Sequence, residues 1–295
     1  MNNTFYINSA QDEDFSHVSR ASIIEGNLEI SRADVRLDKL QEVTGKIILN
    51  GGKLVAKNLR RAKEICVYHG EVELGVMQEV ESVRVEGIQG KIVAQSIGKF
   101  RGVIVVRGTL IETGTEVKTN NDLKYPYSSS IVVDRGGKVH LNNLVNFTRE
   151  NNESVPEIVV LPGSTLELPS LEVFTGNIYV DSAKLYTPKL QRINRGQGKW
   201  SERTGNLVVI GIDSQLIVDA LRSVDGVLKI GDSNEFLRRV DAPSLESVGE
   251  LRTSRFARYI NIGKFSSPGT NVDGISGGKI VEADRGIDER GEREI

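Results

Sequence analysis

The chain has 295 residues, and 38 Lys and Arg against 40 Asp and Glu give it a formal net charge of −2. Nucleic-acid-binding proteins usually carry a basic excess, so this balance argues against that class of partner. The single cysteine, Cys66, excludes an intramolecular disulfide framework and a multi-cysteine zinc site, and three histidines leave few residues for a His-rich metal centre.

The first 20 residues are mostly polar and contain the sequence QDED at 11–14. They lack the basic segment followed by an apolar one that marks a secretory signal, so we expect a cytoplasmic protein, which a larger assembly could incorporate. No segment of the chain reaches the ~18 apolar residues of a membrane span, and membrane insertion is not expected. We interpret residues 1–20 as an N-terminal cap for the domain that follows.

One pattern of nine residues recurs from residue 35 onward. It reads aliphatic, any, small or aliphatic, any two, Leu-like, any two, Val-like, as in VRLDKLQEV at 35–43. Its copies begin at Val35, Leu54, Val72, Ile92, Val139, Leu166, Leu185, Leu216 and Val240. Second segments of alternating aliphatic residues occur at 45–49, 82–85, 102–106, 176–180 and 226–230. Alternation with a period of two predicts strands that bury one face.

These repeats predict an all-β fold, a parallel β-solenoid with two strands and a compact LxxV corner in each coil. Such short units cannot bury their own apolar faces, so neighbouring coils must stack and share a continuous core. Weaker copies at both ends and around Leu110 raise the expected number to about twelve short coils. The alternative, a set of α-helical repeats, conflicts with the abundance of β-branched residues and glycines.

The predicted solenoid is a single domain over residues 21–281, followed by a charged and flexible tail over 282–295. Glycine pairs that precede a lysine and an aliphatic residue fit its tight corners, because glycine adopts positive φ angles. These pairs are Gly51-Gly52, Gly136-Gly137 and Gly277-Gly278.

Three insertions interrupt the repeat at the same place in the coil, after the corner and before the second strand. They cover 113–130, 148–157 and 194–205, so we expect loops that project from one edge of the solenoid. Exposed Trp, Tyr and Arg side chains dominate protein interfaces, which makes this edge a candidate partner-binding site. The alternative is that the loops are tolerated insertions whose aromatic residues cover the core locally. The candidate residues are Asn120, Asp122, Tyr125, Tyr127, Arg149, Arg195, Lys199, Trp200 and Arg203.

No motif in the sequence predicts catalysis, a bound metal or a cofactor. The chain has no Walker A sequence, dinucleotide-binding glycine motif, nucleophile elbow or histidine pair at ligand spacing. The segment NVDGI at 271–275 resembles an element of β-helical pectin hydrolases, but the Asp-Asp, Gly-His-Gly and Arg-Ile-Lys elements of that family are missing. A weaker alternative is an acid–base pair formed by carboxylates on one face. The residues considered for it are Asp181, Asp213, Asp219, Asp225 and Asp232.

The cysteine and the histidines have structural interpretations. Cys66 lies in the strand-like segment ICV, and we expect a small, buried structural residue. His140, between Val139 and Leu141, is expected to point outward from its strand.

The segment IIEGNLEIS at 23–31, followed by LxxV-x-G-x-I and a second LxxL, resembles the receptor L-domain group and its leucine-rich relatives. The similarity covers roughly 23–108 and 166–265. It implies a right-handed solenoid that serves as a non-enzymatic recognition scaffold. The chain departs from that group in lacking flanking cysteines and a signal peptide, so a cell-surface location and hormone-type ligands do not carry over.

Three functional hypotheses follow. The first is a protein-interaction scaffold that presents the inserted loops to a protein partner in an adaptor, immunity or assembly role. The second is a carbohydrate-binding or carbohydrate-depolymerising solenoid of a virion or cell-surface adhesin, with Trp200, Tyr125 and Tyr127 beside a carboxylate pair. The third is a structural protein that self-associates through its terminal coils.

Overall fold

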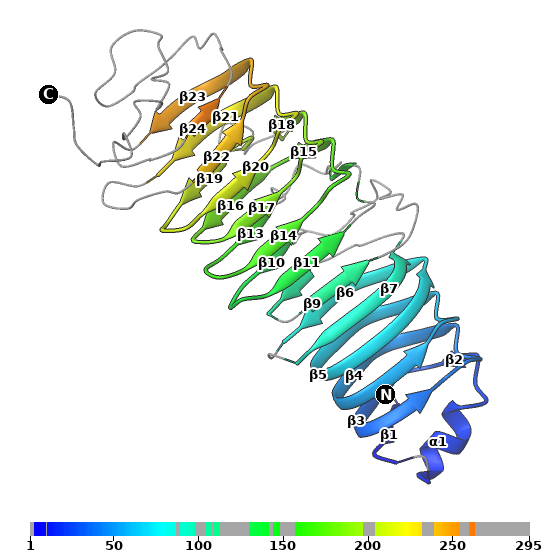
Figure 1. Cartoon of the computed structure of the whole chain (residues 1–295). Coiled ribbons are helices and arrows are strands. Elements are labelled where there is room, and N and C mark those ends of the chain that lie inside the picture. The colour runs from blue at the N-terminus through cyan, green and yellow to red at the C-terminus, as the bar shows by residue number, and fades with distance from the viewer. Residues whose placement is uncertain are drawn as a thin grey trace, which may run out of the picture.

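The computed structural model describes residues 3–9, 11–86, 89–97, 104–107, 109–112, 130–141, 144, 146–147, 157–196, 204–231, 239–253 and 260–262. In this part the protein is all-β, and its parallel strands form a β-solenoid of about 9 turns. The molecule is elongated, with β1 at one end and β23 and β24 at the other (Figure 1). The predicted all-β parallel solenoid is confirmed.

The strands of the solenoid form three parallel ladders, named here sides A, B and C. Side A contains β1 (Thr4–Ile7), β3 (Asn27–Arg36), β4 (Glu42–Ala56), β5 (Arg61–Met77), β6 (Glu79–Val85), β8 (Ile104–Val106), β10 (Ser130–Val133), β13 (Glu157–Val160), β16 (Asn177–Asp181), β19 (Leu207–Ile210), β21 (Ser223–Ile230) and β23 (Ser247–Thr253). Side B contains the later parts of β3, β4 and β5, then β7 (Lys91–Ile97), β9 (Thr109–Glu112), β11 (Lys138–Leu141), β14 (Thr165–Glu167), β17 (Lys184–Tyr186), β20 (Gln215–Ile217), β22 (Arg239–Ala242) and β24 (Ile260–Ile262). Side C contains β2 (Ile23–Ile24), the first residues of β4, β5, β6, β21 and β23, and the short strands β12 (Asn146–Phe147), β15 (Val173–Thr175) and β18 (Arg192–Asn194).

Side C corrects the predicted coil of two strands and a corner. The last residue of the nine-residue pattern lies in a third strand and pairs with its equivalent in the next coil, as Val43 does with Ala62 and Ile193 with Val224. The strands of side C are short, and two-residue pieces are too brief to show alternation. In the sequence, side C therefore looks like a corner between two strands and not like a third strand.

The solenoid has about 9 turns, and the ladder on side A contains twelve successive strands, one for each of the roughly twelve coils that the repeats predict. The end coils are irregular: the first contains helix α1 (Glu13–Val18) between β1 and β2, and the last is described at β23 and β24. Between β9 and β10, residues 113–129 lie outside the described part.

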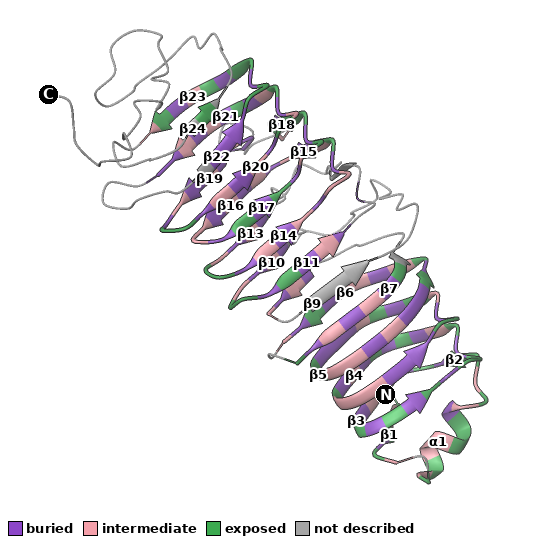
Figure 2. Cartoon of the chain, viewed as in Figure 1, coloured by how far each residue is buried: buried purple, intermediate pink, exposed green. Residues whose placement is uncertain are grey.

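The core is a continuous stack of aliphatic side chains, one set from each coil. Four positions of the nine-residue pattern point inward, and in the copy that starts at Leu166 they are Leu166, Leu168, Leu171 and Phe174, all 0% exposed. Equivalent positions in other coils are also buried, and buried residues alternate with more exposed ones along the strands (Figure 2). Register therefore places like side chains above one another, which lets short coils share one core.

The corner between sides A and B requires backbone conformations that favour glycine. Gly51 and Gly52 have φ values of +91° and +83°, and Gly136 has +76°, so both pairs occupy tight corners as predicted. A Cβ atom at Gly52 would lie 2.2 Å from the carbonyl oxygen of Ala33 in the preceding coil. Close stacking of successive corners thus fixes glycine at this position. The third predicted pair, Gly277-Gly278, lies outside the described residues.

The N-terminal end of the solenoid is closed by α1 and the loop before it. Strand β1 pairs with β3 along one edge, and no second partner strand occurs in the part of the chain that is described. On the opposite edge, the backbone N–H of Tyr6 donates a hydrogen bond to Oδ2 of Asp14 (2.7 Å), and that of Asn8 donates to Oδ2 of Asp12. These carboxylates satisfy backbone groups that would otherwise form an open sheet edge.

Candidate functional site

The predicted insertions rejoin the solenoid along one edge of side A. The chain is described again at Ser130 after the first insertion, at Glu157 after the second and at Thr204, shortly before β19, after the third. Ser130 pairs with Glu157, and β13, β16 and β19 pair in turn. The described ends of the insertions therefore lie within four successive coils on the same edge.

Of the predicted partner-binding residues, the structure describes Arg195. Its side chain is exposed just after β18, and its backbone N–H donates a hydrogen bond to Oδ2 of Asp225 in the next coil (3.2 Å). The neighbouring Gly196 N–H donates to Oγ1 of Thr204 (2.7 Å), which joins the two ends of the third insertion. The other candidates lie outside the described residues and remain a prediction: Asn120, Asp122, Tyr125, Tyr127, Arg149, Lys199, Trp200 and Arg203.

Beside this edge, the outer surface of side A carries a row of apolar residues. The row is formed by register partners on β8, β10, β13, β16 and β19, each of them half-buried: Val105, Val132, Val159, Tyr179 and Val208. Adjacent strands are ~4.8 Å apart, so the row extends for about 19 Å along the solenoid. Contiguous apolar surface of this kind marks interaction sites more often than scattered exposed residues do.

The continuous apolar row is bounded by charged residues at both ends, although Ile48 and Cys66 occupy the same register position in two earlier coils. At the same register position, Arg84 precedes Val105, and Lys229 and then Arg252 follow Val208. Leu161 and Ile210, both half-buried, widen the apolar surface at the ends of their strands. Side chains alternate between the inner and outer faces of a strand, and only the inner ones must be apolar to form the core. Core packing therefore does not explain why these outward residues are apolar.

A ladder of ion pairs covers the earlier coils of side A. Lys46 Nζ lies 2.6 Å from Oε2 of Glu64, and Arg84 Nη1 lies 3.1 Å from Oε1 of Glu86. Arg107 continues the ladder, with Nη1 3.4 Å from Oε1 of Glu86 and Nε 3.4 Å from Oδ2 of Asp134. These charged groups on side A thus have protein partners, in contrast to the apolar row that follows.

The apolar row was not predicted, although its signal is present in the sequence. Three strands of side A read apolar, polar, apolar at their centre: LEI at 28–30, VRV at 83–85 and LKI at 228–230. Two earlier strands have apolar triplets, IIL at 47–49 and ICV at 65–67. The five consecutive middle strands all have three apolar residues in succession: IVV, IVV, IVV, IYV and LVV at 104–106, 131–133, 158–160, 178–180 and 207–209. The middle residue of each triplet is the outward one.

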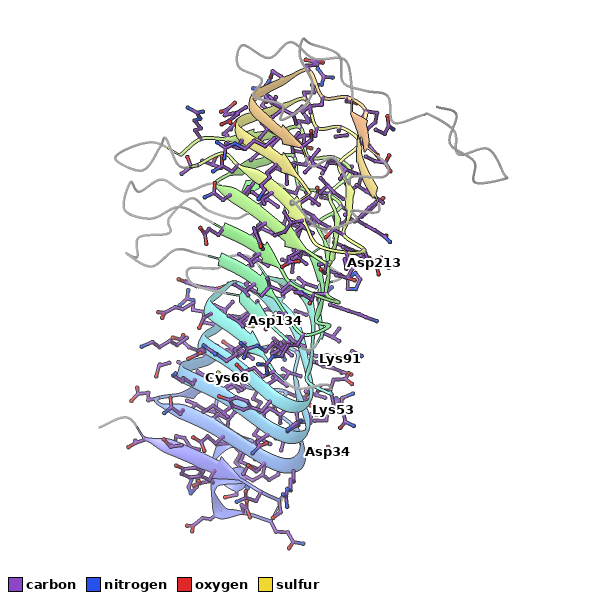
Figure 3. The ribbon with its side chains drawn as sticks, turned by 90° about the vertical axis from the view of Figure 1, so that its left-hand side faces the viewer. Asp34, Lys53, Cys66, Lys91, Asp134 and Asp213 are labelled. Carbon is purple, nitrogen blue, oxygen red and sulfur yellow. The ribbon has the colours of Figure 1, made fainter. Side chains whose placement is uncertain are left out.

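The candidate carboxylates do not gather on one face. Asp181 and Asp213 lie at the corner between sides A and B, Asp219 follows side B, and Asp225 lies between sides C and A. Figure 3 shows Asp213 at the edge that also carries Asp34, Lys53 and Lys91, and the separation of these four along the solenoid. Asp232 and the segment 271–275 lie outside the described residues.

Cys66 and His140 have the structural surroundings that were predicted. The Cys66 side chain is buried, and burial, together with the Glu64 carboxylate, raises the pKa of its thiol to about 12. His140 points outward on side B between buried Val139 and Leu141, and its Nδ1 lies 2.9 Å from Oε2 of Glu167 in the next coil. Neither residue is placed as a nucleophile or a metal ligand.

Within the described ranges, no three His, Cys, Asp or Glu side chains are close enough to hold a metal ion. The same residues contain no helix with the length and hydropathy needed to cross a membrane. Comparison of the chain with protein-family models, curated proteins and solved structures finds no match.

Proposed function

We propose that the protein is a non-enzymatic interaction scaffold that binds a protein partner through the middle of side A and the adjoining insertion edge. The observation that carries this proposal is the apolar row, Val105, Val132, Val159, Tyr179 and Val208. It is solvent-facing, continuous over five strands and bounded by charged residues at both ends. An apolar centre within a polar rim is the usual anatomy of a specific protein interface.

The solenoid supports this role because it holds the row in a fixed register. Each outward residue is carried on a strand that pairs with the strands before and after it, and its inward neighbours are buried in the shared core. Binding therefore requires little ordering of the scaffold itself, which lowers the entropic cost of association. The resemblance of the repeats to receptor L domains and leucine-rich proteins favours the same class of function, recognition without catalysis.

The row alone is small for a stable interface. A row about 19 Å long and one residue wide covers only part of the roughly 800 Å² that each partner buries in a typical complex. The insertions rejoin the solenoid beside it, so they are placed to enlarge the contact. The candidate residues Trp200, Tyr125 and Tyr127 in these insertions are of the types that dominate binding energy.

Co-purification of the tagged full chain from its source cells tests the proposal. The variant Val159→Lys/Val208→Lys places two charges in the row, and we expect it to lose the partner that the wild type retains. Ile217→Lys is the matched control, because Ile217 is also half-buried and outward but lies on side B. Circular dichroism shows whether each variant is folded.

Retention of the same partner by a folded Val159→Lys/Val208→Lys variant would contradict the role of side A. Equal loss in Ile217→Lys would show that the effect is not specific to this side. Deletion of 194–205 separates the two parts of the surface: a partner that survives the deletion but not the valine substitutions is held by the row alone.

A further inference from the structure

A groove lies at another corner of the coil than the insertion edge, where side B passes into side C. It crosses three successive coils near the N-terminal end and has a volume of about 460 Å³. This volume is within the range of small-molecule sites. Its lining residues are Lys57, Asn58, Arg60, Glu73, Leu74, Gly75, Val76, Val93 and Gln95. The groove is separate from the apolar row, and it is not needed for the function proposed above.

Gly75 lets the backbones of two coils that line the groove approach each other closely. Its neighbours in the ladder are Lys57 in the preceding coil and Gln95 in the following one. A Cβ atom at Gly75 would lie 2.0 Å from the carbonyl oxygen of Lys57, so no side chain fits. The corner between sides B and C also differs between these two coils. Lys57 lies in a turn, whereas the equivalent Gly75 lies within strand β5, and the next residue, Val76, is 39% exposed.

The groove presents more positive than negative charge to a ligand. Its one carboxylate, Glu73, is neutralised by Lys53, whose Nζ lies 2.5 Å from Oε1. The hydrogen bond from Lys53, and to a smaller extent the charge of Lys57, lowers the pKa of Glu73. Lys57 itself forms no ion pair with any residue of the described part of the chain.

A second cation is held in place on the groove wall. Arg60 Nη1 donates a hydrogen bond to the carbonyl oxygen of Val76 (2.9 Å), which fixes the guanidinium and leaves other N–H groups for a ligand. Asn58 is likewise fixed, since its Nδ2 donates to the carbonyl oxygen of Asp38 (2.6 Å). The site therefore combines two cations with apolar surface from Val76 and Val93.

We propose that this groove binds a small organic anion, with its carboxylate or phosphate group between Lys57 and Arg60 and its apolar part on Val76 and Val93. Charge-assisted hydrogen bonds to Lys and Arg select the anionic group. The short aliphatic floor, without an aromatic ring among the lining residues, suits a branched or linear alkyl group.

Ligand-observed NMR titration with three probes tests the proposal: 3-methylbutanoate, its neutral amide and inorganic phosphate. We expect saturable binding of at least one anion and weaker binding of the amide, and the anion that saturates identifies the preferred group. Lys57→Gln and Arg60→Gln should each weaken that binding about tenfold or more. Lys39→Gln is the control, because Lys39 is an exposed cation at the same corner of the preceding coil.

The proposal is overturned if neither anion saturates, or if the amide binds as well as 3-methylbutanoate and phosphate does not bind. It is also overturned if folded Lys57→Gln and Arg60→Gln variants bind the anion as the wild type does. Equal weakening in Lys39→Gln would assign the binding to the general charge of the corner instead of to the groove. None of these outcomes depends on the partner bound at side A.

Discussion

Thr187 is a polar residue at a position that the other copies of the pattern fill with Leu, Ala or Val. It occupies the third position of the copy that starts at Leu185, is 0% exposed, and its Oγ1 has no hydrogen-bond partner in the structure. A buried hydroxyl without a partner loses its hydration and gains nothing in return, at a cost of about 1–3 kcal/mol. Thr187→Val keeps the shape of the side chain and should raise the free energy of unfolding by about 1 kcal/mol.

Urea denaturation followed by circular dichroism measures this change. Thr165→Val is the control, since Thr165 is half-buried on the outer surface of side B and its hydroxyl is not confined to the core. It should leave the free energy of unfolding nearly unchanged. If both variants gain equally, the cause is the strand propensity of valine and not the buried hydroxyl.

Cys66 should be an inert thiol as long as the solenoid is folded. Burial and the Glu64 carboxylate raise its pKa from 9.0 to about 12, which at pH 8 leaves roughly a thousandfold less of the reactive thiolate. Iodoacetamide labelling followed by mass spectrometry should therefore show slow modification of the native protein and rapid modification in denaturant. Thr44→Cys in a Cys66→Ala background supplies an exposed thiol for comparison. Fast labelling of native Cys66 would contradict the buried position.

At the scale of single elements, the sequence predicts inward residues well and outward ones poorly. Leu166 and Leu171 recur at fixed spacing because each coil must contribute to the same core, so their burial follows from the repeat. No such constraint acts on the outward residues, and Val159 and Tyr179 are recognised as one surface only when register places them side by side. The short strands of side C escape prediction because two or three residues cannot show a period.

The candidate site divides in the same way. The position of the insertions in the coil predicted a common edge, because equivalent positions stack in any solenoid. The groove could not be predicted, since it depends on Gly75 meeting the backbone of Lys57 in another coil. Nothing in the local sequence around Gly75 distinguishes it from a glycine in an ordinary turn.

The first coil prevents unwanted pairing at the N-terminal end. Asp14 accepts a hydrogen bond from the N–H of Tyr6 on the free edge of β1, so Asp14→Ala should open this edge to a second copy of the chain. Size-exclusion chromatography with light scattering should then show larger assemblies whose population rises with protein concentration. Glu13→Ala removes the same charge from the exposed face of α1 and should behave as the wild type does. An unchanged state of Asp14→Ala would mean that α1 alone protects the end.

At the scale of the whole molecule, folding of the solenoid depends on the register of its strands more than on the number of its coils. Sides A, B and C are ladders of paired strands, and the apolar row and the anion groove lie on different sides and in different coils. Neighbouring coils contribute to each surface, but distant coils do not. Such a molecule should tolerate the loss of an entire coil, provided that equivalent positions are rejoined.

Deletion of residues 166–184 tests this property, because Thr165 and Lys184, and Leu166 and Leu185, are register partners. The deletion joins Thr165 to Leu185 and removes one coil without shifting any inward position. We expect a folded protein whose dependence of unfolding free energy on urea falls by about a tenth, in proportion to the surface lost. Deletion of 166–175 is shorter but joins side B directly to side A, so it removes a side C strand, leaves a core gap and should abolish cooperative unfolding. If the two deletions are equally stable in urea, stacking in register is not what holds the solenoid together.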